Sequence, residues 1–410
     1  MPPPVRLFSV RLFPVRLFPV RLFSVRLFPA RLFSVRLFPA RLFPVRLFSV
    51  RLFFLPLLIA LLALQFFHLR LPQPLNLPEQ QTVVSHNPII GLHTRLTGIG
   101  DEAYIQQALE QVREMGASWV VDLFPWAYVQ PRSRYGYDWT GADMVIEHAH
   151  RQGLQVIARL DIVPAWARPP GSTDRHLDPE YYADYANYVA AFAARYTPQG
   201  VRHIIIWNEP NLSFEWGERP PDPGAYAALL KVVYPQVKAV APDAIIVAGA
   251  LSPGSPLDDG RTRMDDMQYL ASLYDAEAAP YFDMWAVHAY GGLEPPTAEP
   301  APERVNFRRI ELVRAMMEQF GDGHKHMIIT EGGYNDHPRW NGAVTPAERI
   351  NWTIATYELA QSYPWLDAVA LWQHSTPFTT RSHPDAWNFV APDGTPRAIY
   401  HAVRAYALQE

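Results

Sequence analysis

The sequence predicts one (β/α)8 barrel, an α/β TIM-barrel fold, over residues 88–410, preceded by a low-complexity N-terminal repeat and one apolar helix. From Pro88 onward, eight short apolar runs alternate strictly with longer amphipathic runs, which implies parallel strands joined by right-handed crossovers. The length, about 320 residues, suits one closed barrel with extended loops. An open doubly wound sheet is the alternative. It favours a glycine-rich first turn, whereas the first strand here runs into Gly91-Leu92-His93-Thr94-Arg95.

The apolar runs are expected to form strands, and the amphipathic runs between them are expected to form helices. The expected strands are 89–94, 118–123, 155–160, 202–207, 244–249, 283–288, 326–330 and 367–372. The expected helices are 101–116, 140–152, 179–196, 223–240, 264–276, 303–320, 346–361 and 396–408. Helix N-terminal signals stand at Asp101-Glu102, Asp178-Pro179-Glu180, Asp222-Pro223 and Thr345-Pro346-Ala347-Glu348.

Residues 1–51 form a repeat that fits no regular secondary structure. Ten copies of a pentapeptide, Val or Ala followed by Arg, Leu, Phe and Ser or Pro, run from residue 5 to residue 54 with small variations at the end. A period of five carries the arginines around a helix or alternates them between strand faces, and proline removes backbone donors. We expect this segment to be disordered. It is interpreted either as a basic tether on anionic lipid or as a DNA repeat translated from a misassigned start codon.

An apolar segment follows over residues 52–69. Its eighteen residues lie between Arg51 and Arg70 and are mostly Leu, Phe, Ala and Ile. That length is about the minimum for a membrane-spanning helix and is long for a signal peptide. The preceding arginines place the N-terminus in the cytoplasm, so we expect an extracytoplasmic barrel held by a signal anchor, or a secreted one if the segment is cleaved. Residues 70–87 are interpreted as a proline-containing linker.

The barrel region is acidic. Residues 1–54 hold ten Arg and no Asp, Glu or Lys, which leaves 26 basic and 40 acidic residues in the rest of the chain, a formal charge of −14. Such a surface repels phosphates and argues against a nucleic-acid partner. The chain has no cysteine, which excludes disulfides, thiolate metal sites and cysteine nucleophiles. The sequence does not indicate an oligomeric state.

Two glutamates follow two separate buried strands. Ile204-Ile205-Ile206 leads into Trp207-Asn208-Glu209-Pro210, and Met327-Ile328-Ile329-Thr330 leads into Glu331. In a (β/α)8 barrel the active site lies at the C-terminal ends of the strands, and strands four and seven face each other across the mouth. We therefore expect the two carboxylates to converge for acid/base and nucleophilic work on a glycosidic bond. A separation of about 5–5.5 Å would give retention of configuration, and about 6.5–9.5 Å would give inversion.

These two motifs resemble those of clan A glycoside hydrolases, and within the clan the chain looks most similar to families 39 and 5. The resemblance implies a retaining double displacement without cofactor or metal, with Glu209 as the acid/base and Glu331 as the nucleophile. Glu209 must hold a proton before bond cleavage and release it afterwards, when glycosylation has removed the charge of Glu331. The implied carbohydrate substrates are β-linked: xylosides or uronides for family 39, and β-glucans or mannans for family 5.

The resemblance also implies roles for four residues in substrate binding. Asn208 would hydrogen-bond the sugar 2-hydroxyl, and Trp372 would stack on the sugar ring. Tyr290 would hold the nucleophile carboxylate through its hydroxyl, and His288 would line the subsite of the reacting sugar. A lone histidine or tryptophan after an apolar strand is more often a core residue, so these assignments depend on the motifs.

The sequence departs from the family pattern in the second and third strands. Clan members commonly carry an arginine late in strand two, but Trp119-Val120-Val121-Asp122-Leu123-Phe124 has none, and strand three lacks the histidine of family 5. We hypothesise that Arg159, from strand three, supplies the missing positive charge. Three tryptophans in the loops after strands two, three and four are expected either to form sugar platforms or to pack against the protein surface: Trp126, Trp166 and Trp216.

Two other functions compete with a glycosidase. A membrane-tethered, non-catalytic carbohydrate-binding barrel would keep the aromatic platforms and would not need the glutamates. The paired glutamates count against it, and the missing strand-two arginine keeps it as an alternative. A metallohydrolase barrel would use some of the fourteen histidines, but the sequence has no His-x-His at strand one and no His-Glu-x-x-His.

Overall fold

The computed structural model describes residues 74–410. The predicted repeat (1–51), the predicted apolar segment (52–69) and the first residues of the predicted linker lie outside this range. Within residues 74–410, no helix combines the length and the apolar character that a membrane span requires. The described end of the linker is fixed to the barrel, because the Gln81 amide donates to the Arg151 carbonyl at 2.7 Å and the Asn87 side chain to the Tyr357 carbonyl at 3.2 Å.

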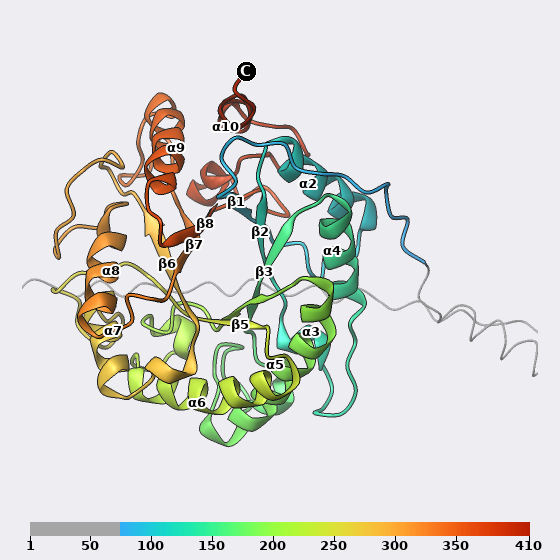
Figure 1. The fold of residues 1–410 in the computed structure, drawn as a ribbon, viewed down its shortest axis with the longest axis vertical. Helices are drawn as coiled ribbons and strands as arrows, with labels where there is room; N and C mark the ends of the chain where they lie inside the picture. Colours follow the sequence, from blue (N-terminus) through green and yellow to red (C-terminus); the bar gives the residue numbers. More distant parts are fainter. Residues whose placement is uncertain (1–73) are drawn as a thin grey trace, which may run out of the picture. The chain divides into compact units, whose positions relative to one another are not determined.

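The predicted closed barrel of eight parallel strands is confirmed (Figure 1). Each strand pairs in parallel with its neighbours in the sequence, and the first strand pairs with the eighth. Every strand lies within three residues of its predicted bounds at either end. The strands are β1 (Ile90–His93), β2 (Trp119–Leu123), β3 (Gln155–Leu160), β4 (His203–Ile206), β5 (Ile245–Leu251), β6 (Met284–Tyr290), β7 (Met327–Gly333) and β8 (Leu366–Leu371).

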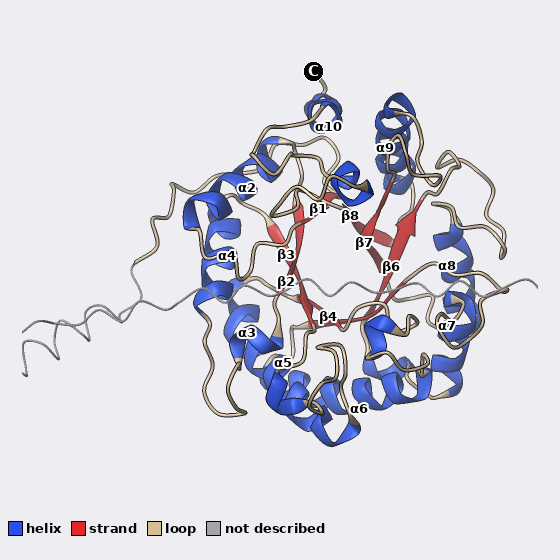
Figure 2. Cartoon of the chain, turned by 180° about the vertical axis from the view of Figure 1, so that it is seen from behind, coloured by secondary structure: helices blue, strands red, loops and turns tan. Residues whose placement is uncertain are grey.

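Helices ring the strands on the outside (Figure 2). The side chains of Asp101, Asp222 and Thr345 accept hydrogen bonds from the first turns of their helices, as their sequence signals predict, and Glu348 completes a capping box with Thr345. The helices are α2 (Glu102–Glu114), α3 (Trp126–Val129), α4 (Thr140–Arg151), α5 (Tyr182–Tyr196), α6 (Pro223–Val240), α7 (Asp266–Asp275), α8 (Arg309–Gln319), α9 (Pro346–Gln361) and α10 (Ala398–Leu408).

Two helix starts differ from the sequence expectation. The helix expected from residue 303 begins at Arg309, because the preceding loop folds onto the Arg309 guanidinium, which bonds the carbonyls of Pro302 and Arg304 at 2.6 and 3.1 Å. The helix expected from Pro179 begins with one 3-10 turn and becomes α-helical at Tyr182.

The barrel interior is a packed core separate from the layer between strands and helices. Small and large residues alternate around it: Trp119 on β2 lies beside Gly91 on β1, and Ala368 and Ala370 come from β8. Side chains along a strand point alternately to its two faces, so the inward-facing residue two positions further along each strand lies nearer the C-terminal mouth of the barrel. Those upper positions are occupied by polar residues, among them His93, Arg159 and His288.

Gly91 is a position where the interior has no room for a side chain. A Cβ atom there would lie 2.9 Å from the Trp119 Cβ and 3.2 Å from the Ala370 Cα. We expect Gly91→Ala to destabilise the fold by about 1–3 kcal/mol through overpacking. Gly141→Ala is the matched control, because that glycine lies in α4 with no atom nearer than 3.7 Å and should gain helix propensity. The two urea midpoints test this; equal midpoints would contradict it.

Candidate active site

The two glutamates meet at the mouth of the barrel. Glu209 lies three residues beyond the end of β4, and Glu331 lies near the end of β7. One carboxylate oxygen of each, together with a ring nitrogen of His288, falls within a mutual distance of 4.8 Å. The Glu331 side chain is 9% exposed and that of Glu209 is 12% exposed, so both are mostly buried but reachable from the mouth.

Glu209 is presented by an unusual stretch of backbone. Trp207 and Glu209 have positive φ angles of 73° and 38°, which is uncommon for residues with side chains and costs on the order of 1–3 kcal/mol each. The stretch is held in place because the Trp207 indole donates to the Glu215 carbonyl at 2.8 Å and the Glu209 amide donates to the Ala250 carbonyl at 3.1 Å. This backbone conformation turns the Glu209 carboxylate into the mouth, a direction that a regular extended strand would not give it.

Glu331 reaches the interior through a register shift between β6 and β7. Val287 pairs with Ile329, but the next pair is His288 with Glu331, so Thr330 is an extra residue in β7. Inserting one residue moves the following side chains to the other face of a strand. Without this shift, the inward-facing series from Ile328 would place Thr330 in the mouth instead of Glu331.

Donors surround the Glu331 carboxylate. Arg159 Nη1 donates to Oε1 at 2.7 Å, and the Tyr290 hydroxyl donates to Oε2 at 2.9 Å. Burial alone would raise the pKa of this carboxyl. The neighbouring His288 ring, Arg159 guanidinium and His93 ring outweigh burial and, with the Tyr290 bond, hold the pKa of Glu331 well below its ordinary value. Glu331 is therefore ionised at neutral pH, which is the state a nucleophile needs.

His288 lies between the two carboxylates. Its Nδ1 is 2.8 Å from Glu209 Oε1 and 3.7 Å from Glu331 Oε2. Burial lowers the pKa of His288, but the charge of Glu331 and the bond to Glu209 raise it above its ordinary value. The sequence assigned His288 to a sugar subsite. The structure adds a direct contact with Glu209, so its protonation is linked to both glutamates.

Asn208 and Arg159 are joined by a hydrogen bond. Arg159 Nη1 donates to Asn208 Oδ1 at 2.9 Å as well as to Glu331. The Asn208 oxygen is thereby engaged, and its amide NH2 group remains as a donor for a ligand oxygen. Arg159, which we hypothesised from the sequence to replace the missing strand-two arginine, contacts Glu331. Asp122, late in β2, does not take part: it is buried and accepts bonds from the Thr94 hydroxyl and the Leu96 amide.

Trp372 lines a cavity whose lining residues include neither glutamate, but its ring connects that cavity to Glu331 through His93. Its ring packs against His93 with the centroids 4.6 Å apart, and His93 Nε2 is 3.8 Å from Glu331 Oε1. The cavity has a volume of about 780 Å³ and spans the loops after β1, β2, β3 and β8. Arg95 is the one charged residue among those that line it, and the aromatic lining residues are Tyr128, Trp372, Phe378 and Trp387.

The suggestion that loop tryptophans form sugar platforms is wrong for two of the three. Trp126 is 0% exposed and Trp216 is 2% exposed, and both rings belong to the core between barrel and helices. Each loop folds back, so Trp126 packs on Tyr188 and Trp216 packs on Trp207. Trp166 is partly buried, and its indole donates to the Gln130 carbonyl at 2.7 Å.

Several residues of the site escaped the sequence analysis. His93 ends β1, and within residues 74–410 neither of its buried ring nitrogens has a hydrogen-bond partner. The sequence feature that could have indicated His93 as a site residue was its position near the end of an expected strand, two residues after Gly91. Trp387 packs on Tyr290 with centroids 5.2 Å apart but comes from a 3-10 turn, His383–Trp387, that has no recognisable sequence motif. Asp161, Arg175 and Glu215 form ion pairs behind Arg159 and likewise lacked a sequence signal.

Glu215 is a buried carboxyl near Glu209. Burial raises its pKa to about 7; Arg175 opposes the shift, whereas Asp161 and Glu209 add to it. Between its ordinary value of 4.5 and about 7, the unfolded chain loses this proton while the folded chain keeps it, so stability falls as pH rises.

Replacing Glu215 should remove that pH dependence. As the pH rises from 5 to 8, we expect the free energy of unfolding of Glu215→Gln to increase relative to that of the wild type by up to roughly 3 kcal/mol. Urea unfolding at both pH values measures the difference. Glu299→Gln, at a side chain that is 81% exposed, is the control. A constant difference between the Glu215→Gln variant and the wild type at both pH values would contradict the expectation.

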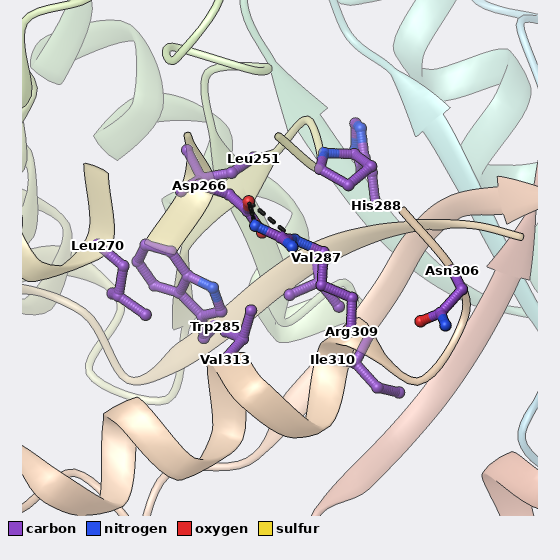
Figure 3. A pocket seen from close by; sticks show the side chains of 11 residues that line it. Leu251, Asp266, Leu270, Trp285, Val287, His288, Asn306, Arg309, Ile310 and Val313 are labelled. Atoms are coloured by element: carbon purple, nitrogen blue, oxygen red, sulfur yellow. Dashed lines mark hydrogen bonds and ion pairs between the residues drawn. The ribbon is translucent and has the colours of Figure 1, made fainter. Parts of the chain in front are cut away.

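A second pocket lies behind the site, between β5 and β6 and helices α7 and α8 (Figure 3). Figure 3 shows Asp266 joined to Arg309, and Arg309 Nη2 is 2.7 Å from both Asp265 and Asp266. The second pocket has a volume of about 10 Å³, which is room for no more than a water molecule. The residues that line this pocket form the wall behind His288, and the pocket is too small for a sugar.

Within the described residues, one group of acidic and imidazole side chains could hold a metal ion, and it consists of Glu209, His288 and Glu331. Both oxygens of Glu331 already accept bonds, from Arg159 and from Tyr290. A guanidinium at 2.7 Å opposes a second cation at the same carboxylate. The donor set therefore fits acid/base chemistry better than metal binding.

Comparisons with known proteins agree with this fold. No protein-family model and no curated protein matches the sequence. Among solved structures, a family 39 glycoside hydrolase from the gut symbiont Bacteroides cellulosilyticus matches with a TM-score of 0.63 at 20% identity, over 81% of this chain and 65% of that chain. A monomeric β-xylosidase from Caulobacter crescentus matches with a TM-score of 0.60 at 19% identity, over 80% of this chain and 69% of that chain.

A family 5 enzyme from Bifidobacterium longum, solved in complex with Manβ1-4GlcNAc, matches with a TM-score of 0.57 at 15% identity, over 78% of each chain. At such identities the similarity shows the barrel fold, and one fold hosts many activities. The chain spans 65% of the family 39 enzyme, so it corresponds to only part of that protein. These neighbours agree with the clan A resemblance carried by the Glu209 and Glu331 motifs.

Proposed function

We propose that this protein is a retaining glycoside hydrolase that acts on β-linked glycosides. One observation carries the proposal: one carboxylate oxygen of Glu209 and one of Glu331 lie within 4.8 Å of each other at the mouth of the barrel. Retaining enzymes place their two carboxyl groups about 5–5.5 Å apart, whereas inverting enzymes need about 6.5–9.5 Å to admit a water molecule. The short distance supports a double displacement.

In the first step, Glu331 attacks the anomeric carbon while Glu209 protonates the leaving oxygen, and a glycosyl–enzyme ester forms as the glycosidic bond breaks. Arg159 and Tyr290 keep Glu331 ionised and aimed before the attack. In the second step, Glu209 takes a proton from water, and the water oxygen displaces Glu331 from the anomeric carbon. Two inversions at one carbon give net retention.

Asn208 has the geometry to contribute to both steps. Its oxygen is fixed by Arg159, so its NH2 group is left to donate to the hydroxyl next to the anomeric carbon. Such a contact strengthens in the transition state. Trp372, at the wall of the 780 Å³ cavity, would supply an apolar face for the sugar ring.

Turnover of aryl β-glycosides, with proton NMR of the first-formed anomer, tests the proposal. The panel comprises xyloside, glucoside, mannoside, galactoside and, because Arg95 is the one cation that lines the cavity, glucuronide. Release of the β-anomer from any of them supports retention, and release of the α-anomer overturns it. Binding without turnover across the panel would favour the alternative, a non-catalytic carbohydrate-binding barrel. Export of the barrel by residues 52–69 remains part of the proposal.

A further inference from the structure

A chain of buried, alternating acidic and basic side chains runs from the mouth into the loops behind it. Arg159 contacts Glu331 at 2.7 Å on one side and Asp161 at 3.4 Å on the other. Arg175 Nη1 contacts the same Asp161 oxygen at 2.5 Å, and its Nε contacts Glu215 at 3.1 Å. None of these five side chains is more than 16% exposed.

We propose that Arg175, acting through Asp161, is a positioning residue that keeps the Arg159 guanidinium against the nucleophile. This inference rests on the proposed function, because it concerns how the same site is assembled. It explains how an arginine from β3 can serve a nucleophile on β7 although the second strand carries none.

Arg159 lies between two competing carboxylates. Asp161 is two residues away on the same segment and is fully buried, so without another partner it would draw the guanidinium away from Glu331. Arg175 opposes this by taking the shared Asp161 oxygen at a distance 0.9 Å shorter than Arg159 does, 2.5 against 3.4 Å. Arg159 Nε is left without a hydrogen bond, while its Nη1 serves Glu331 and Asn208.

The fold brings Arg175 to this place from a long loop. The loop after β3 folds back on itself, because the Val163 amide donates to the Asp174 carbonyl at 2.7 Å, which sets Arg175 beside Asp161. Glu215 stands in the 3-10 turn Phe214–Trp216 after β4, and its carbonyl holds the Trp207 indole. Arg175 thus links the loop that follows Arg159 with the loop that presents Glu209.

Substitution of Arg175 tests the inference. We expect Arg175→Ala to lower kcat on the best aryl glycoside by about 100-fold with KM changed less than about threefold, because the nucleophile is misplaced while sugar contacts remain. Guanidinium ion at millimolar concentrations should restore part of kcat, which a merely structural defect would not show. Arg195→Ala is the matched control, since Arg195 pairs with Asp143 at the surface, with a side chain 41% exposed, and should leave kcat unchanged.

The possible outcomes separate the two claims. A wild type inactive on every substrate overturns the proposed function and, with it, this inference. An active wild type with equal kcat in the Arg175→Ala and Arg195→Ala variants overturns the inference alone, as does a folded Arg175→Ala variant whose loss guanidinium cannot relieve. If Arg175→Ala does not fold, Arg175→Lys decides: a lysine can neutralise Asp161 but not also bridge to Glu215, so kcat should fall about tenfold, and an unchanged kcat overturns the inference.

Discussion

Glu331→Ala should lower the turnover of an activated aryl β-glycoside by about 10⁴-fold or more. Without the carboxylate no glycosyl–enzyme ester forms, and the donors Arg159 and Tyr290 no longer have a charged group to hold in place. Arg159, whose side chain is 6% exposed, is then left without its 2.7 Å partner. Removing one partner of a buried ion pair costs roughly 3–5 kcal/mol, and Asp161 is the acidic partner that remains, at 3.4 Å, so Glu331→Gln is the companion variant that keeps the shape of the site.

Azide makes this expectation specific. In Glu331→Ala the small anion can occupy the space of the lost carboxylate and attack the anomeric carbon directly, while Glu209 still protonates the leaving group. The product should be an α-glycosyl azide, detected by NMR. Glu180→Ala, at an exposed glutamate beside α5, should behave as the wild type. Activity of Glu331→Ala within tenfold of the wild type would remove Glu331 as nucleophile.

Glu209→Ala should show a loss that depends on the leaving group. Alkyl and sugar leaving groups need protonation, so their cleavage should fall by about 10²–10⁴-fold. A dinitrophenolate leaves without a proton, so the ester on Glu331 should still form and then accumulate, because no base activates water. A burst of dinitrophenolate followed by a slow steady state, measured by stopped flow, is the expected result.

Azide should reverse the second defect of Glu209→Ala. It needs no general base, so it attacks the accumulated ester from the face that Glu209 had occupied and gives a β-glycosyl azide. The two variants should therefore yield azides of opposite configuration from one substrate. Identical configuration, or an equal loss for all leaving groups, would contradict the assignment of the acid/base role to Glu209.

The sequence by itself determined the elements and their order. Apolar runs such as Ile204-Ile205-Ile206 produced strands within three residues of the expected ends, and capping residues such as Thr345 marked the helix starts. These features depend on neighbours within a few positions along the chain, which a sequence displays directly. The strict alternation of strand and helix then left a closed parallel barrel as the simplest arrangement, with Glu209 and Glu331 at its mouth.

Only the tertiary structure decided which side chains meet. The extra Thr330 in β7 turns Glu331 inward, the fold-back of the β3 loop brings Arg175 to Asp161, and the inward packing of Trp126 removes it from the site. No local pattern records these outcomes, because each depends on the register between strands and on competition for partners among residues far apart in the chain. The distance between two carboxylates that stand 122 residues apart is set by barrel closure, and it has no counterpart in the order of the amino acids.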